Sequence, residues 1–240
     1  MNPRAFGWVR ALRQTPLHPQ WLLPTRTAVQ ELAIEWSKGT VLDIGCADRW
    51  IERVLPADRN YIGLDYPPTG DKLYHAVPDC FGNALNLPFG AGTIDTVLLL
   101  DVLEHLSDPG RALDEAFRIL KPGGSIVVSV PFLYPVHDAP FDFQRLTTYG
   151  LTHALTQRGF SKSLTTQYSR SAEVVGLFVS LWIGGLAFQC WQRKKIALII
   201  ALPLLALVPA VNLCAWLAAR VLPDWPAIYG GVNAVAKKDR

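Results

Sequence analysis

The sequence lacks a strong charge of either sign. Its 240 residues carry 23 Lys and Arg against 20 Asp and Glu, which leaves a formal net charge of +3. A nucleic-acid-binding domain usually has a larger basic excess, so no nucleic-acid partner is expected. Arg4, Arg10 and Arg13 are not followed by a continuous apolar run, and no signal peptide is therefore expected.

Cysteine is also scarce. The chain has four cysteines, Cys46, Cys80, Cys190 and Cys214. None of them stands in a CxxC or CxxH spacing, so neither a disulfide framework nor a structural zinc site is expected, and a reducing compartment fits better. No other metal-ligand cluster is apparent in the sequence, and no metal is predicted.

Apolar residues, in contrast, are abundant. Half of the residues are hydrophobic and the mean hydropathy is +0.19. That value is high for a soluble protein and predicts that part of the chain meets lipid. The length suffices for one α/β domain with an appendage.

Residues 40–65 form the clearest local pattern. The apolar run 41–44 predicts a buried strand, a turn of small residues and a short helix follow, and 61–64 predict a second strand that ends at Asp65. This order is typical of a βαβ unit that binds a nucleoside. Glycine in the turn lets the backbone approach the ligand, and the acid accepts the ribose hydroxyls.

The rest of the chain alternates strands and helices. Further strands are predicted at 95–100, 125–130, 163–168 and 231–236, with a short strand tip and turn at 81–89. Helices are predicted at 25–38, 109–120 and 148–158. Asp108 and Pro109 are suited to begin the second of these helices, and residues 121–124 to end it. Asp114 and Glu115 fall on its expected exposed face. The alternation predicts a mostly parallel, doubly wound sheet.

Five blocks occur in the order and spacing of one family: VLDIGCADRW, YIGLD, GNALNLPF, DTVLLLDVLEHL and ALDEAFRILKPGGSIVVSVPF. Together they resemble the class I S-adenosylmethionine-dependent methyltransferases, especially the small-molecule enzymes similar to the ubiquinone and sterol methyltransferases. The resemblance covers residues 25–168 and the last strand. It implies a Rossmann-like α/β fold with a seven-stranded, mostly parallel sheet, and S-adenosyl-L-methionine as the cofactor.

The resemblance also implies a cofactor site. Asp43, Gly45 and Cys46 would form the turn beneath the methionine part of the cofactor. Asp65 would bind the ribose hydroxyls, and Tyr66 would lie against the adenine.

Two further segments complete the implied site. Asn83 and Ala84 would lie at the adenine edge, and Asp101 and Val102 would face the sulfonium. Asn83 stands where the family usually has aspartate, but its amide oxygen can still accept a hydrogen bond from the adenine amino group.

The turn after the first strand departs from the family pattern. Ala47 and Arg49 replace two of the usual glycines, so only Gly45 remains. Alanine is expected to be tolerated if φ at Ala47 is below zero. Arg49 is expected either to point outward or to cover the site.

The segment 131–146 is expected to face the substrate, because ligands of open α/β sheets bind beyond the carboxyl ends of the strands. His137 is the predicted general base, oriented by Asp138 or Asp142. A base is needed only where the acceptor retains its proton at neutral pH. In the alternative interpretation His137 and Asp142 only fix the loop, with Arg145 paired to Asp142.

His105 is the second catalytic candidate. It follows the fourth strand and would contact cofactor or substrate near Asp101. In the alternative interpretation Glu104 and His105 only brace the following turn.

Two long uncharged segments, 174–192 and 196–219, precede the last strand. The second is long enough to span a bilayer, and Pro203 and Pro209 are expected to kink it. Because both ends of this insertion return to one sheet, a single span is excluded. A shallow helical hairpin in one leaflet is favoured, with the basic residues 193–195 at the cytoplasmic headgroups. A full transmembrane hairpin and an apolar dimer interface are the alternatives.

The predicted regions are an N-terminal arm at 1–24, a methyltransferase core at 25–170, a hydrophobic helical hairpin at 171–222, and the last strand with a basic tail at 223–240. The arm is expected to be an irregular segment packed on the domain; the alternative is a lid or a membrane-surface arm that uses Phe6, Trp8 and Trp21.

The predicted function is methyl transfer to a lipid-like or lipid-linked small molecule at the cytoplasmic face of a membrane; a cytoplasmic enzyme is the alternative. Two other functions compete. Ala47, Arg49 and Asn83 suggest a catalytically degenerate membrane scaffold. An NAD(P)-dependent oxidoreductase ranks last, because the GxGxxG pattern is missing. The acceptor atom and the oligomeric state do not follow from the sequence.

Overall fold

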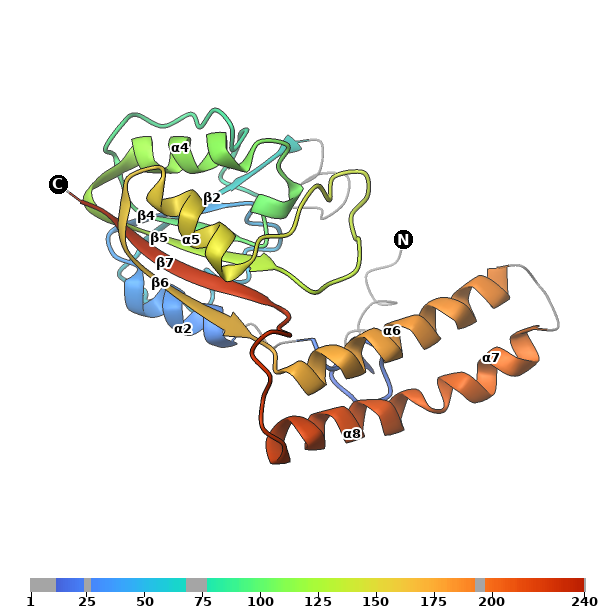
Figure 1. Cartoon of the computed structure of the whole chain (residues 1–240). Coiled ribbons are helices and arrows are strands. Elements are labelled where there is room, and N and C mark those ends of the chain that lie inside the picture. The colour runs from blue at the N-terminus through green and yellow to red at the C-terminus, as the bar shows by residue number, and fades with distance from the viewer. Residues whose placement is uncertain (1–11, 24–26, 68–76, 193–196, 240) are drawn as a thin grey trace. The chain divides into compact units, whose positions relative to one another are not determined.

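The computed structural model describes residues 12–23, 27–67, 77–192 and 197–239 (Figure 1). The chain divides into two compact units. One comprises Met1–Thr25 and Ser169–Gly230, and we call it the helical unit; the other comprises Arg26–Tyr168 and Gly231–Arg240, and we call it the α/β unit. The N-terminal segment therefore groups with the apolar helices, and the last strand groups with the α/β core.

The α/β unit is built on a seven-stranded sheet in the order β3-β2-β1-β4-β5-β7-β6. Its strands are β1 (Thr40–Ile44), β2 (Asn60–Asp65), β3 (Cys80–Phe81), β4 (Ile94–Leu100), β5 (Leu120–Pro131), β6 (Phe160–Tyr168) and β7 (Gly231–Lys238). The pairs from β3 to β5 are parallel, and β7 is antiparallel to both β5 and β6. This confirms the predicted fold class, including the last strand beside residues 125–130.

Helices cover both faces of this sheet (Figure 1). They are α2 (Thr27–Trp36), α4 (Pro109–Ile119) and α5 (Thr148–Thr156), with a 3-10 turn η2 (Leu103–His105) after β4. Val29 and Ala33 of α2 are buried in a core cluster with Val41 and Leu98 of the central strands. Asp108 caps α4 as predicted, because its carboxylate accepts a hydrogen bond from the Arg111 backbone N–H at 2.9 Å. Thr25, the expected cap of the first helix, lies outside the described residues.

One local prediction was wrong, and a second was incomplete. The short helix expected after β1 is a series of turns over residues 47–55. Arg49 has φ +55°, which no α-helix accommodates, and this interrupts the helical path. Residues 121–124 also do more than end α4: they form an irregularity within β5, where a Cβ on Gly124 would lie 2.8 Å from the Lys121 carbonyl oxygen.

The helical unit contains α6 (Ser171–Gln192), α7 (Ala197–Leu205) and α8 (Val208–Val221). The second apolar segment is thus broken into two helices, with Pro203 inside α7 and Pro209 in the first turn of α8. Proline removes a backbone donor and clashes with the preceding turn, which explains the break. Helices α6 and α8 lie side by side (Figure 1), and Gly176 allows their close approach, since a Cβ there would lie 2.3 Å from the Cβ of Ala215.

A buried polar contact ties the N-terminal segment to these helices. The Ser180 hydroxyl donates to Asn212 Oδ1 at 2.8 Å, and both side chains are fully buried. Asn212 Nδ2 in turn donates to the carbonyls of Pro16 at 2.7 Å and His18 at 3.0 Å. Residues 12–23 therefore pack within the helical unit, while Phe6 and Trp8 lie outside the described residues.

Two stretches of the helical unit, Ser171–Gln192 and Pro203–Val221, are long and apolar enough to cross a bilayer. Helix α6 is apolar around most of its circumference, and Trp182 and Trp191 are 65% and 63% exposed. The basic residues 193–195, on which the predicted shallow topology depends, lie outside the described residues.

Candidate cofactor and acceptor site

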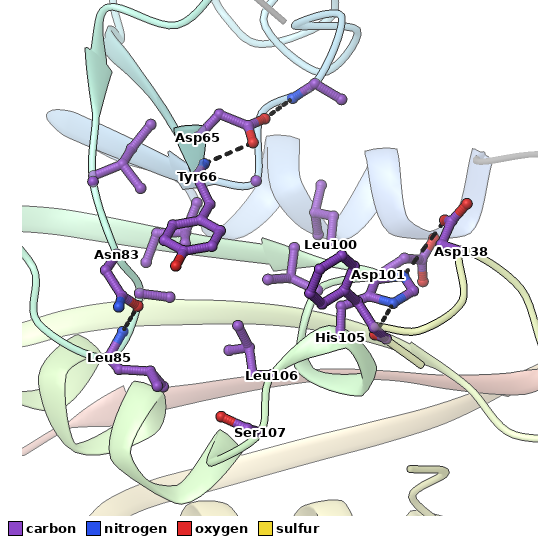
Figure 2. A pocket seen from close by; sticks show the side chains of 18 of the residues that line it. Asp65, Tyr66, Asn83, Leu85, Leu100, Asp101, His105, Leu106, Ser107 and Asp138 are labelled. Carbon is purple, nitrogen blue, oxygen red and sulfur yellow. Dashed lines mark hydrogen bonds and ion pairs between the residues drawn. The ribbon is translucent and has the colours of Figure 1, made fainter. Parts of the chain in front are cut away.

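A cavity of about 410 Å³ opens at the carboxyl ends of β1, β2 and β4. This is where open α/β sheets bind ligands, and the volume falls in the range of small-molecule sites. Figure 2 shows Asp65, Tyr66 and Asn83 at one end of the cavity and His105 with Asp138 at the other. The sheet therefore brings together residues that lie up to 73 positions apart.

The turn after β1 has three residues with positive φ, although only one of them, Gly45, is a glycine. Gly45 has φ +78°, and a Cβ there would lie 2.6 Å from Cγ2 of Val102. Ala47 and Arg49 also adopt positive φ values, +44° and +55°. The condition under which alanine was expected to be tolerated, a negative φ at Ala47, is therefore not met. A left-handed conformation costs about 1–2 kcal/mol for a residue with a Cβ, so the chain retains this turn at some cost in stability.

Arg49 points away from the cavity, the first of the two predicted alternatives. Its guanidinium contacts Glu52 at 2.8 Å and Asp79 at 2.9 Å, and it lies over the ring of Tyr61. It does not line the cavity. The substitution of glycine by arginine thus leaves the cofactor side of the turn open.

Asp65 connects the tip of β2 to this turn. One carboxylate oxygen accepts a hydrogen bond from the Ala47 backbone N–H at 2.9 Å, and the other accepts from the Tyr66 N–H at 2.8 Å (Figure 2). The carboxylate lines the cavity although the residue is only 4% exposed. Its orientation is therefore fixed by the backbone, as a group that binds ribose hydroxyls requires.

Asp43 and Cys46 lie behind the turn and do not line the cavity. Asp43 accepts a 2.6 Å hydrogen bond from the Tyr61 hydroxyl, and burial together with Asp43 raises the pKa of Tyr61. Burial, then the charges of Asp43 and Asp65, raises the pKa of the Cys46 thiol to about 12. Both residues therefore support the turn from the core side, while Gly45 and Asp65 of the predicted set face the cavity.

Asn83 and Ala84 line the cavity as predicted. The Asn83 side-chain oxygen accepts a hydrogen bond from the Leu85 N–H at 2.9 Å, which stabilises the loop (Figure 2). Glu115 supports the same loop, because its carboxylate accepts from the Leu87 N–H at 2.8 Å and pairs with Arg118. The predicted exposed position of Glu115 was wrong: the residue is 6% exposed.

Asp101 and Val102 line the cavity after β4. Asp101 has φ +56°, and its carboxylate accepts a 2.7 Å hydrogen bond from the Ser129 hydroxyl. This contact with β5 fixes the side chain beside Val102, whose own side chain lies against Gly45.

Both predicted catalytic histidines line the far end of the cavity. Their rings lie edge to face with centroids 4.9 Å apart. His137 Nδ1 lies 3.2 Å from the Pro135 carbonyl oxygen and 3.3 Å from Asp142 Oδ2, so both groups orient this ring. Asp138 instead lies 3.9 Å from His105 Nε2, and His105 Nδ1 lies 2.9 Å from the Phe141 carbonyl oxygen (Figure 2).

Asp142 also pairs with Arg145, as the alternative interpretation of the loop expects. Its side chain is 1% exposed, and both of its oxygens accept hydrogen bonds from Arg145. These hydrogen bonds, together with one from the His137 backbone N–H, outweigh burial and hold the pKa of Asp142 far below its usual value. An ionised Asp142 thus serves both purposes: it fixes the loop and orients His137.

Glu104 was not predicted as a site residue. It is 1% exposed, and neither carboxylate oxygen has a hydrogen-bond partner in the described part of the chain. Burial and then the charge of Asp101 raise its pKa well above the usual value. Its carboxylate lies 3.8 Å from His105 Nε2. The only signal in the sequence is its place beside His105 after a strand.

A family model described as a methyltransferase domain matches residues 24–163, which is more than half of the chain. The chain belongs to this methyltransferase domain family. Solved methyltransferase structures share the fold of this chain. A methyltransferase of Archaeoglobus fulgidus described as SAM-dependent aligns with TM-score 0.56 at 15% identity, covering 96% of this chain and 100% of that chain.

Other methyltransferases share the fold or part of the sequence. A probable S-adenosylmethionine-dependent methyltransferase of Mycolicibacterium smegmatis is 31% identical over 151 residues, covering 58% of this chain and 59% of the relative. A Haemonchus contortus phosphoethanolamine N-methyltransferase 2, solved with S-adenosyl-L-methionine, aligns with TM-score 0.52 at 13% identity, covering all of this chain and 60% of that chain. The chain spans less than two thirds of the length of the curated relatives it matches. The predicted family and cofactor, S-adenosylmethionine, are confirmed.

Proposed function

We propose that this chain is a methyltransferase that uses S-adenosylmethionine to methylate a lipid-like or lipid-linked small molecule at the cytoplasmic face of a membrane. One observation carries the proposal of methyl transfer. A single cavity is lined at one end by Gly45 and Asp65 and at the other by His105 and His137. A nucleoside site and two imidazoles therefore share one space, in which a cofactor and an acceptor can be aligned.

The cofactor, when bound, supplies an electrophilic methyl group for an in-line displacement. The chain has to align the acceptor with that group and exclude water. Asp65 would bind the ribose hydroxyls, with its carboxylate fixed by the Ala47 and Tyr66 N–H groups. His137 would accept the proton of an acceptor hydroxyl at Nε2 while Asp142 holds Nδ1.

The proposed membrane location rests on the helical unit. Two stretches meet the length and composition of a membrane segment, and large aromatic side chains such as Trp182 and Trp191 are exposed on α6. Exposed apolar surface of this extent is typical of contact with lipid or with another protein. A hairpin held in one leaflet suits a broken α7–α8 segment better than a straight span does.

The proposal of methyl transfer is tested with the full-length protein in detergent. S-adenosylhomocysteine binding is measured by calorimetry, and label transfer from radioactive cofactor into a membrane lipid extract is measured by extraction. Asp65→Asn should weaken binding at least tenfold, because it removes the charge that orders the ribose hydroxyls. Asp48→Asn, an exposed acid in the same turn, is the matched control and should bind normally.

The outcomes separate enzyme from scaffold. Binding without label transfer into any lipid fraction would contradict the proposed acceptor class. No binding at millimolar concentration would favour the degenerate scaffold instead. Residues 45, 47 and 49 of the turn after β1 keep positive φ values although only one of them is glycine. The backbone shape of this turn therefore gives the scaffold alternative little support.

The membrane location is tested by sedimentation. The wild-type protein should pellet with membranes, and Trp182→Lys combined with Trp191→Lys should shift a large part of it to the supernatant. Tyr149→Lys is the matched control, since this aromatic side chain is 87% exposed in the α/β unit. A wild-type protein found in the supernatant would refute the location.

A further inference from the structure

A set of metal-ligand groups lies at the far end of the cavity, where His105 and His137 line the wall and the buried Glu104 lies behind it. Glu104, His105 and His137 each direct one ligand atom to a common region, and these atoms lie within 4.8 Å of one another. A tetrahedral ion at about 2.1 Å from each donor would place the donors about 3.4 Å apart. Side-chain rotations on the order of an ångström therefore close the set around an ion.

The two histidines are oriented as metal ligands usually are. A ligating histidine normally donates its other ring N–H to a carboxylate or a carbonyl oxygen, which fixes the tautomer. His105 Nδ1 lies 2.9 Å from the Phe141 carbonyl oxygen, and His137 Nδ1 lies 3.2 Å from the Pro135 carbonyl oxygen and 3.3 Å from the Asp142 carboxylate. In both rings this leaves Nε2 as the nitrogen with a lone pair.

Glu104 gives an independent reason to expect a cation. A carboxylate that is 1% exposed and has no hydrogen-bond partner in the described residues is costly to bury. The two terminal nitrogens of Arg145, the nearby basic group, already donate to Asp142, and its Nε has no partner among the described residues. A divalent ion between the carboxylate and the imidazoles would supply the missing partner.

We propose that Glu104, His105 and His137 bind one divalent transition-metal ion, with a coordination position open to the cavity. Two imidazoles and one carboxylate favour zinc, cobalt, iron or nickel over magnesium, which prefers oxygen ligands alone. The Asp138 carboxylate, 3.9 Å from His105 Nε2, would add a fourth protein ligand only in a five-coordinate site, which still keeps one position open to the cavity. The sequence predicted no metal, because no cluster of metal-ligand residues is apparent in it.

The role of the ion, unlike its binding, rests on the proposed function. An acceptor hydroxyl at the open position would lose its proton more readily beside a divalent charge. His137 would then hold the ion, and the charge of the ion would replace the imidazole as the group that activates the acceptor.

Metal binding is tested on chelator-treated full-length protein without cofactor. Equilibrium dialysis against Zn²⁺ should show about one equivalent bound with a micromolar Kd, and Co²⁺ should give the visible absorption of a nitrogen- and oxygen-ligated site. His105→Gln and His137→Gln should each weaken binding at least tenfold. His153→Gln, which alters an exposed histidine on α5, is the matched control and should bind like the wild type.

A second measurement avoids any effect of the substitutions on folding. Wild-type protein is modified with diethylpyrocarbonate with and without Zn²⁺, and the sites are mapped by mass spectrometry. Zn²⁺ should protect His105 and His137 but not His153. The proposal is overturned if Zn²⁺ does not bind below millimolar concentration, or if His153 is protected as much as the other two. Because no cofactor is present, a failure of methyl transfer leaves this result unaffected.

Discussion

Gly45 offers the sharpest test of how the cofactor turn is built. In Gly45→Ala the new methyl group would lie 2.6 Å from Cγ2 of Val102 at a backbone with φ +78°. The left-handed backbone alone costs about 1–2 kcal/mol. The steric overlap adds about 1–3 kcal/mol, because Val102 is held between the turn and β4 and must move. We expect a total loss of unfolding free energy of about 2–5 kcal/mol.

A matched control separates the two contributions. Gly92 also has a positive φ, +65°, but a Cβ there would meet nothing within 4 Å. Gly92→Ala should therefore lose only the backbone part, about 1–2 kcal/mol. In Gly45→Ala combined with Val102→Ala the steric overlap should be relieved and the backbone cost should remain.

The assays are urea unfolding and calorimetry with S-adenosylhomocysteine. Gly45→Ala should weaken ligand binding at least tenfold, because the turn lines the cavity and Val102 faces the same space. Gly92→Ala should bind normally. Equal losses of stability and unchanged binding in both variants would refute the assignment of Gly45 to the cofactor site.

Three further predictions concern groups that support the site. Ala47→Gly should raise the unfolding free energy by up to about 1 kcal/mol, because glycine adopts φ +44° without strain and this gain exceeds the cost of a more flexible unfolded chain. A lower unfolding free energy in urea would contradict the strain argument. Asp142→Asn should cost about 3 kcal/mol because it leaves Arg145 without its paired charge, and differential scanning calorimetry should show the loss. The pKa of Glu115 is lowered, first by its hydrogen bonds from Arg118. The ionised carboxylate therefore adds to the unfolding free energy above the usual pKa of about 4.3, and this addition is lost as the pH falls through the lowered pKa. The difference in unfolding free energy between wild type and Glu115→Gln should accordingly be largest at neutral pH and shrink in acid, and a difference that grows in acid would refute the sign.

Much of the α/β unit follows from local patterns in the sequence. Continuous apolar runs located β1, β2, β4 and β5, and Asp108 marked the start of α4, because burial on both faces and helix capping each leave a short-range signature. The position of β7 beside β5 came from the family resemblance, since pairing of distant strands has no local signal; its pairing with β6 was not predicted.

The parts that could not be predicted depend on tertiary contacts. Glu115 was expected on the surface because its helix position is polar, yet Arg118 and the Leu87 N–H make burial favourable. The positive φ at Ala47 is imposed by the Asp65 carboxylate and the strand tip, which hold the turn in place. The meeting of His105 with His137 requires the loop after β5 to fold back against the 3-10 turn η2, where Phe143 N–H donates to the Glu104 carbonyl.

The pairing of Tyr168 with Gly231 has a consequence for the order in which the chain can fold. Residues 169–230 separate these neighbours, so β7 leaves the ribosome only after α6, α7 and α8. Until then β5 and β6 each present an unpaired edge, and such edges promote aggregation. The apolar helices are thus synthesised while the sheet is still incomplete. Their capture by a bilayer or a chaperone during synthesis would hold the nascent chain apart from its copies until the closing strand arrives.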